Sequence, residues 1–454
     1  MMDLRSGGVA PVRALAEAIR ARVAGSVDDV EVRVERADQV AYNLEGAVLV
    51  PELEVDAVNV AMRARVRGRT AVAAVTGSSV DEAVGAIRAA LAAAEPDGLD
   101  DFPVLDGGGD VDARGWDDAT AALVDRPSAV RERAAAMAKA AEGARRSADL
   151  VLEGSVGVAR AWRAMATGRG ETVLSARTSA SAYLLVDGSE WDSVASIADP
   201  GVEAAAELGA KLTSTLPTRI VGVAEWLGAS RECVVVLDPR LVETLLRALL
   251  LERVGLDRVL AGLSPAAVGD VVAAPAFSLF DDPSATGSLA GHVVDDEGVR
   301  GRRKAVIEGG VLRTLLSDRR SAKMAGGVAT AGNGFRIPLM SEDPGEAPVR
   351  VAMGHLEVPA GDVPRASLVR GRTVLLSGLL GVHSANKSTG AFNNPLQGGV
   401  ALEDGVPVAR LRAGAWSARG NVHELLRGIE GLSVERMHTG AGTLPWVAAP
   451  VRLA

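Results

Sequence analysis

The chain has 454 residues, more than one hydrophobic core usually serves, so at least two domains are expected. Its net charge of -9 argues against a general nucleic-acid binder, which would carry a basic face. The single cysteine, Cys233, excludes an internal disulfide, and no apolar run approaches the ~20 residues of a membrane span. The sequence therefore predicts a cytoplasmic globular protein.

The first 95 residues predict helices packed on a sheet. Apolar residues recur at helical spacing up to Val23, and valines alternate with charged residues over 30–35, as in a half-buried strand. Strands are also expected over 58–66 and 70–75. Ser79 begins a capping box, with an acidic residue three positions later, and so predicts the start of a helix. Residues 1–95 are therefore interpreted as an N-terminal α+β segment.

The middle of the chain is expected to complete this first domain. Residues 96–118 are rich in Gly, Asp and Pro and predict a linker or a long exposed loop. A helix is expected over 127–146, followed by strands near 149–161 and 172–186. Residues 119–220 form the middle segment of this interpretation.

A change of character near 218–231 marks the main expected domain boundary. The helical pattern over 241–254 is followed mostly by short strands and turns. Gly309-Gly310 and Asp404-Gly405 each separate two apolar runs, which predicts two hairpins. Residues 230–454 are expected to form a strand-rich domain with mixed and antiparallel sheets, and the whole chain an α+β fold.

A local metal or nucleophile motif is not found. His423-Glu424 begins like H-E-x-x-H, but Arg427 stands where the second histidine would be. Cys233 lies inside an apolar run, which favours a core position over a reactive one. A metal site assembled from distant residues remains open at this point. The histidines available to it are His292, His355, His383, His423 and His438.

Five carboxylates lie within a short span of sequence and allow two interpretations. They could bind a hard cation or serve acid–base chemistry. They could also occupy turns and pair with the basic run Arg302-Arg303-Lys304 that follows them. The carboxylates are Asp281, Asp282, Asp295, Asp296 and Glu297.

Several segments, in order along the chain, resemble the TldD/PmbA family of peptidase proteins. Val293–Arg320 is similar to the family's D-D-E-G-V segment, its I-E-x-G-x-L hairpin and its D-R turn. Gly332–Arg336 resembles T-G-N-x-x-R, one residue short, and Ser388–Phe392 resembles T-G-D-F with Ala391 in place of Asp. Leu402–Val406 and Gly420–Leu426 are similar to I-E-N-G-x and G-N-L-x-x-L-L.

The resemblance implies a chain without its own zinc site. TldD-type subunits of the family carry H-E-x-x-x-H on a helix, whereas PmbA-type (TldE) subunits lack it. The corresponding positions here are Arg247, Ala248 and Glu252, and no cysteine ligand lies near His438. Arginine stays protonated and does not bind zinc. The resemblance therefore implies no catalytic residue and no zinc on this chain. Hydrolysis is expected only in a heterodimer with a zinc-bearing TldD-type partner. Pairing of the chain with itself is the alternative.

By this resemblance the partner's zinc would activate water against a peptide bond. This chain would close the chamber and hold an unfolded or modified peptide, for example by strand addition at a sheet edge. The expected substrate-facing rim consists of Asn333, Arg336, His383, Thr389 and Phe392. Purely structural roles in turns and core are the alternative for these five residues.

Two other functions stay open at this point. The chain could be a regulatory or scaffold protein that binds a protein partner, or a divergent enzyme of natural-product biosynthesis.

Overall fold

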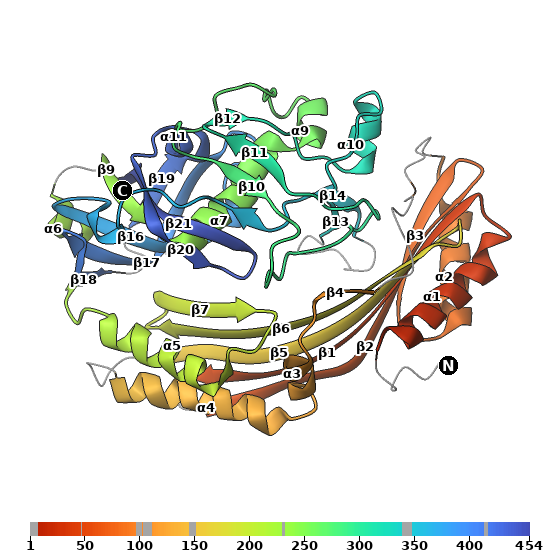
Figure 1. Ribbon diagram of the computed structural model, residues 1–454, viewed down its shortest axis with the longest axis horizontal. Helices are drawn as coiled ribbons and strands as arrows, with labels where there is room; N and C mark the ends of the chain where they lie inside the picture. Colours follow the sequence, from red (N-terminus) through yellow and green to blue (C-terminus); the bar gives the residue numbers. More distant parts are fainter. Residues whose placement is uncertain are drawn as a thin grey trace.

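The computed structural model describes residues 8–46, 48–96, 102, 111–144, 151–228, 232–337, 347–412 and 416–454. Two large sheets dominate it (Figure 1): one built from strands between residues 29 and 196, the other from strands between 220 and 453. Helices cover parts of both. The predicted α+β class, with a strand-rich C-terminal half, is confirmed.

The first sheet is made of long, mostly antiparallel strands in the order β3-β2-β1-β5-β6-β4, with β7 also paired to β6. Only β4 runs parallel to its neighbour, β6. The strands are β1 (Asp29–Glu45), β2 (Val48–Val66), β3 (Arg69–Thr76), β4 (Val111–Gly115), β5 (Leu152–Thr167), β6 (Thr172–Val186) and β7 (Glu190–Ser196).

Helices pack on one face of this sheet. Side chains alternate between the two faces of a strand, so Val30, Val32 and Val34 of β1 bury against two N-terminal helices, and Val40 and Leu44 against two later ones. The opposite face, called the inner face below, turns toward the C-terminal domain (Figure 1). The helices are α1 (Val9–Ala24), α2 (Val80–Ala93), α3 (Asp118–Leu123), α4 (Pro127–Ala144) and α5 (Gly201–Thr215).

Two expectations for this half need correction and a third is confirmed. Strand β2 begins at Val48, ten residues before the expected start, because pairing with β1 continues through Pro51, a residue that argues against a strand in sequence. Residues 111–115, expected to lie in a loop, form β4. The Ser79 cap is confirmed, since its hydroxyl accepts a hydrogen bond from the Glu82 N–H. Residues 97–101, 103–110 and 145–150 lie outside the described part of the chain.

The second sheet follows the order β12-β11-β10-β15-β21-β9-β16-β17-β18-β8. In addition, β19 pairs with β17 and β21, and β20 pairs with β21. Both predicted hairpins are present, β11–β12 and β17–β18. The strands are β8 (Ile220–Val221), β9 (Glu232–Leu237), β10 (Leu279–Asp281), β11 (Lys304–Glu308), β12 (Val311–Leu312), β15 (Leu356–Glu357), β16 (Arg372–Leu379), β17 (Ala391–Glu403), β18 (Val406–Leu411), β19 (Ser417–Asn421), β20 (Gly431–His438) and β21 (Gly442–Leu453).

Short elements complete the C-terminal half. Strands β13 (Gly334–Arg336) and β14 (Val349–Val351) form a separate two-stranded sheet. Helical segments connect the strands: α6 (Val223–Leu227), α7 (Pro239–Leu245), η1 (Leu246–Leu250), α8 (Leu251–Val254), α9 (Leu256–Leu260), α10 (Arg319–Met324), η2 (Arg365–Ser367), η3 (Val382–Ser384) and α11 (Val422–Arg427).

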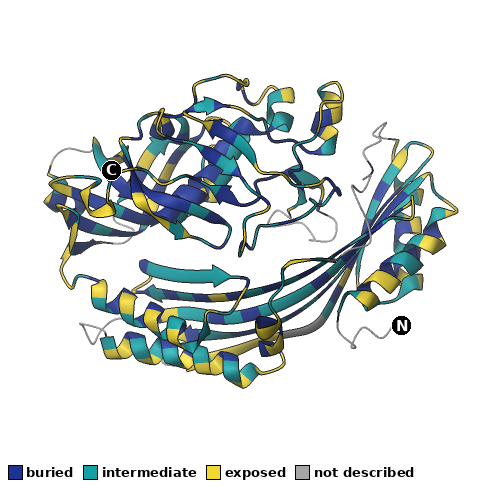
Figure 2. Ribbon diagram, viewed as in Figure 1, coloured by how far each residue is buried: buried dark blue, intermediate teal, exposed yellow. Residues whose placement is uncertain are grey.

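The helix expected over 241–254 lies in the C-terminal core but is not uniformly α-helical. It begins at α7, where the Asp238 carboxylate accepts a hydrogen bond from the Arg240 N–H, passes through the π-helical turn η1 and ends with α8. The expected buried face is confirmed, since Leu245 and Leu249 are 2% and 0% exposed. Figure 2 shows this buried helix between exposed outer elements.

Among the helices of the described residues, none is both long and apolar enough to cross a membrane.

Candidate functional site

The π-helical turn η1 carries Arg247, the residue that the resemblance aligns with a zinc-binding histidine. Its guanidinium Nε donates to Glu243 Oε1 at 2.7 Å. Nη1 donates to the Met353 carbonyl, and Nη2 to the carbonyls of Gly354 and Ala441, each at 2.8 Å. One planar cation therefore joins the helix to two separate segments of the C-terminal domain.

The groups around Arg247 continue this polar network. Thr439 donates its hydroxyl to Glu243 Oε2, so the carboxylate is held from two sides. His355 lies nearby, with Nδ1 2.8 Å from the Ser288 hydroxyl and its ring stacked on His438 at 5.8 Å between centroids. Burial, and then the neighbouring His438, lower the pKa of His355, which favours the neutral ring.

The donor set at this place does not suit zinc. Arg247 carries no lone pair for a metal, and Ala248 offers no side-chain ligand. Glu252 forms an ion pair with Arg258 at 2.7 Å. Glu243 is already engaged by Arg247 and Thr439. Within the described ranges, His, Cys, Asp and Glu side chains form no group of three or more arranged to hold a metal ion.

The first two carboxylates of the acidic run lie close to the basic run, as the pairing interpretation expects. Asp281 is fully buried and accepts hydrogen bonds from Lys304 Nζ at 3.2 Å and from the Asn333 amide. Asp282 lies 3.6 Å from the guanidinium of Arg303. Asn333, from the expected rim, thus supports a buried network, and its second amide hydrogen reaches the Ala352 carbonyl.

Asp295 and Glu297 are buried carboxyls held by backbone N–H groups. Asp295 accepts from the N–H groups of Glu297, Val299 and Gly334. Glu297 accepts from the Arg319 N–H at 2.7 Å. Burial raises the pKa of Asp295 to about 6 and that of Glu297 to about 8. The Glu297 carboxyl is therefore mostly protonated at neutral pH.

Asp296 and Arg336 join the C-terminal domain to the inner face of the first sheet. Asp296 Oδ1 accepts from Arg163 Nη1 of β5 at 2.9 Å and lies 3.5 Å from Arg33 of β1. Arg336 donates to Glu31 Oε1 of β1 at 2.8 Å, and both side chains are buried. Although burial opposes ionisation, the arginines around Asp296 and Glu31 hold the pKa of both carboxyls below the ordinary range.

The other three expected rim residues lie on one segment, apart from Asn333 and Arg336. His383, in η3, and Thr389, in the turn before β17, are exposed. Phe392 is buried in the core, with its ring against Gly420. No interaction recorded among the described residues joins the two groups. The substrate-facing role of all five residues remains a prediction.

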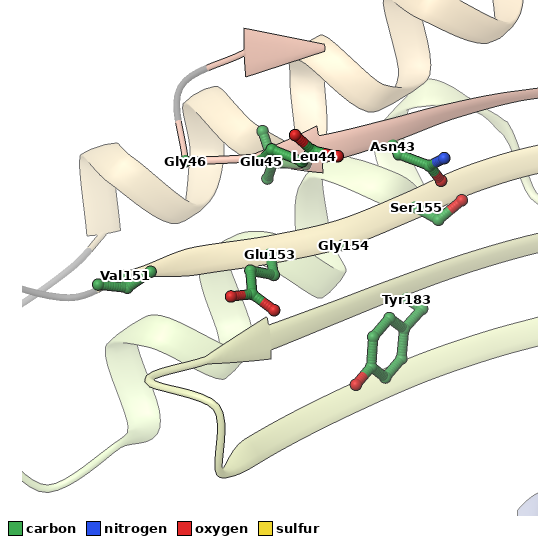
Figure 3. A pocket seen from close by; sticks show the side chains of 9 residues that line it. All are labelled: Asn43, Leu44, Glu45, Gly46, Val151, Glu153, Gly154, Ser155 and Tyr183. Atoms are coloured by element: carbon green, nitrogen blue, oxygen red, sulfur yellow. The ribbon is translucent and has the colours of Figure 1, made fainter. Parts of the chain in front are cut away.

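A hollow of about 630 Å³ lies on the inner face of the first sheet, where β1 ends and β5 begins (Figure 3). Glu45 and Glu153 lie directly opposite each other across β1 and β5. Tyr183 of β6 completes the lining, and burial together with Glu153 raises the pKa of its hydroxyl. Sequence reasoning did not single out this hollow, because its members come from strands that are distant along the chain.

Comparison with known proteins agrees with the resemblance. Residues 230–451 match the PmbA/TldA metallopeptidase C-terminal domain. A protein of Archaeoglobus fulgidus described as a metalloprotease is 28% identical over 205 residues, which cover 44% of this chain and 45% of that protein. The chain thus matches slightly under half the length of this curated relative.

Three solved structures share the whole fold. A TldE from Thermococcus kodakarensis superposes with a TM-score of 0.79 at 21% identity, covering 96% of this chain and all of its own. Proteins described as putative modulators of DNA gyrase, from Thermotoga maritima and Bacteroides thetaiotaomicron, give 0.74 and 0.75 at 18% and 17% identity. Each of these two alignments covers 97% of this chain and at least 98% of the other. Residues 230–451 thus form a C-terminal domain of the PmbA/TldD metallopeptidase family, and the whole chain shares the fold of these three structures.

Proposed function

We propose that this chain is the TldE-like, non-zinc subunit of a TldD/TldE-type peptidase. The observation that carries the proposal is the environment of Arg247. A protonated guanidinium stands at the family's metal-binding position and is held by a carboxylate and three backbone carbonyls. In this proposal, Arg247 stands at the position of a metal ligand, and its positive charge is bound by other groups of the same chain.

The shape of the helix supports the same relationship. A π-helical turn forms hydrogen bonds between residues five apart, and five residues is the spacing of the two histidines in H-E-x-x-x-H. Here the π-helical turn η1 begins one residue before Arg247, and Glu252 follows in α8. We infer that the helix keeps a backbone suited to that motif, while its side chains have changed from metal ligands to structural ion pairs.

In the proposed complex, the zinc of a TldD-type partner supplies the Lewis acid and the activated water. This chain contributes walls that hold an unfolded or modified peptide. Extended peptides bind well at sheet edges, because backbone hydrogen bonds demand little of the peptide's sequence. Of the expected rim residues, His383 and Thr389 are exposed and therefore able to contact a substrate.

The test is to purify this chain alone and together with a TldD-type subunit, and to measure zinc content and hydrolysis of unstructured peptides. We expect well under one zinc per chain and no hydrolysis for the chain alone, with hydrolysis restored in the pair. A matched control is the triple variant Arg247→His, Ala248→Glu, Glu252→His, which should remain inactive alone because a fourth ligand is missing. One zinc per chain, or peptidase activity without a partner, would contradict the proposal.

A further inference from the structure

We propose that the buried carboxyl of Glu190 makes the contact between the β6–β7 hairpin and the C-terminal sheet sensitive to pH, so that ionisation of this carboxyl releases the hairpin. The inference rests on contacts within the chain and is independent of the proposed function. In Figure 1 the hairpin lies along the side of the first sheet that turns toward β17.

Glu190 is the first residue of β7, yet it is bound by the other domain. Its Oε1 accepts a hydrogen bond from the Gly399 N–H of β17 at 2.9 Å, and its side chain is 3% exposed. The hydroxyl of Ser377, on β16, lies beside the carboxyl. The carboxyl is therefore enclosed by two strands of the C-terminal sheet.

A glycine allows this close approach. A Cβ atom added at Gly398 would lie 2.5 Å from the Ser189 carbonyl oxygen, 2.7 Å from Ser377 Oγ and 3.2 Å from Glu190 Oε2. The two domains thus meet here without room for a side chain. A charged Glu190 would therefore lose most of its contact with bulk water while the hairpin stays docked.

The other charged groups at this contact are already paired. Arg410 of β18 donates from Nη1 to Asp187 Oδ2, in the turn before β7, at 2.7 Å. Arg240 donates to Asp192 Oδ1 at 2.6 Å and lies 4.2 Å over the ring of Trp191. Arg410 also favours the ionised form of Glu190, but it shares its charge with Asp187. Arg410 Nε is buried without a hydrogen-bond partner, so this arginine acts on Glu190 through its charge alone.

The direction of the pH effect follows from the carboxyl's environment. Burial raises the pKa of Glu190 to about 7, against the opposing effects of the Gly399 hydrogen bond, Arg410 and Ser377. In the released, solvated hairpin the carboxyl would titrate near its ordinary 4.5. Between pH 4.5 and about pH 7, the docked state keeps a proton that the released state has lost. Docking therefore weakens as pH rises through this range and through about 7, the pKa of the docked state. The two pKa values differ by about 2.5, which corresponds to a roughly 300-fold change in the docking equilibrium constant between low and high pH.

The experiment is hydrogen exchange of the full chain between pH 6 and pH 8, with rates corrected for the intrinsic pH dependence. The wild-type protection of the β7 segment and of the β17 segment around Gly399 should fall about tenfold, while α1, far from the contact, should not change. Glu190→Gln, an uncharged isostere, should hold protection within twofold across the range. Asp192→Asn, which removes the neighbouring carboxylate paired with Arg240, should keep the tenfold fall.

A flat wild-type profile would overturn the proposal, and so would an equal fall in Glu190→Gln. If Glu190→Gln does not fold, the wild-type and Asp192→Asn series still decide. A fall that appears equally in α1, or that is lost in Asp192→Asn, would assign the effect to global stability or to the Arg240 pair.

Discussion

Replacing Arg247 by methionine removes the cation that joins η1 to two other segments of the C-terminal domain and keeps most of the side chain's apolar volume. The substitution leaves the Glu243 carboxylate without its arginine, and Thr439 is the donor that remains to it among the described residues. It also removes the donors of the Met353, Gly354 and Ala441 carbonyls.

The size of the effect follows from the burial of the pair. The Arg247 and Glu243 side chains are 28% and 12% exposed. Removing one partner of a fully buried pair costs about 3–5 kcal/mol, and the residual solvent access here lowers the expected loss to about 2–4 kcal/mol. Arg247→Lys keeps the charge but loses the forked geometry, so we expect a loss of about 1–2 kcal/mol. Adding Glu243→Gln to Arg247→Met should recover about 1 kcal/mol, because no uncompensated charge remains.

The measurement is the free energy of unfolding of the four proteins from urea titrations at pH 7, with zinc content recorded alongside. The order of stability should be wild type, Arg247→Lys, the double variant, then Arg247→Met. A loss under about 1 kcal/mol in Arg247→Met, or no recovery in the double variant, would refute the idea that this guanidinium organises the site.

Three further results are expected. Burial raises the pKa of Glu297 to about 8 in the folded protein, against about 4.5 when it is unfolded. The free energy of unfolding should therefore fall as pH rises from about 4.5 to 8. Glu297→Gln should flatten this fall, as measured by urea midpoints at pH 5.5 and 8.5. Arg336→Ala removes one of the two arginines paired with buried Glu31, the other being Arg63, and should cost about 2–4 kcal/mol of unfolding free energy. Arg303→Ala, at a side chain that is 46% exposed, should cost under about 1 kcal/mol. His383→Ala should leave unfolding unchanged and slow peptide hydrolysis by the complex; unchanged hydrolysis would remove His383 from the rim.

Local patterns were sufficient for the elements whose signals are short in range. The α+β class, the cap at Ser79, both glycine-containing hairpins and the buried Leu245/Leu249 face depend on residues that are neighbours in sequence or one helical turn apart. The Glu243–Arg247 pair has the same origin, since residues four apart on a helix face each other. That spacing was present in the sequence and would have identified Glu243.

The contacts between the two domains needed the tertiary structure. Glu31 and Arg336 are 305 residues apart, and Glu190 and Gly399 are 209 apart, so no periodicity links them. For the same reason, the sequence could name Asn333 and Arg336 as rim candidates without showing that both are buried in polar networks. By itself the sequence determined that Arg247 cannot hold zinc, because that is a property of the side chain. Only the fold decided what the arginine holds instead, because its three carbonyl partners come from segments that packing brings together.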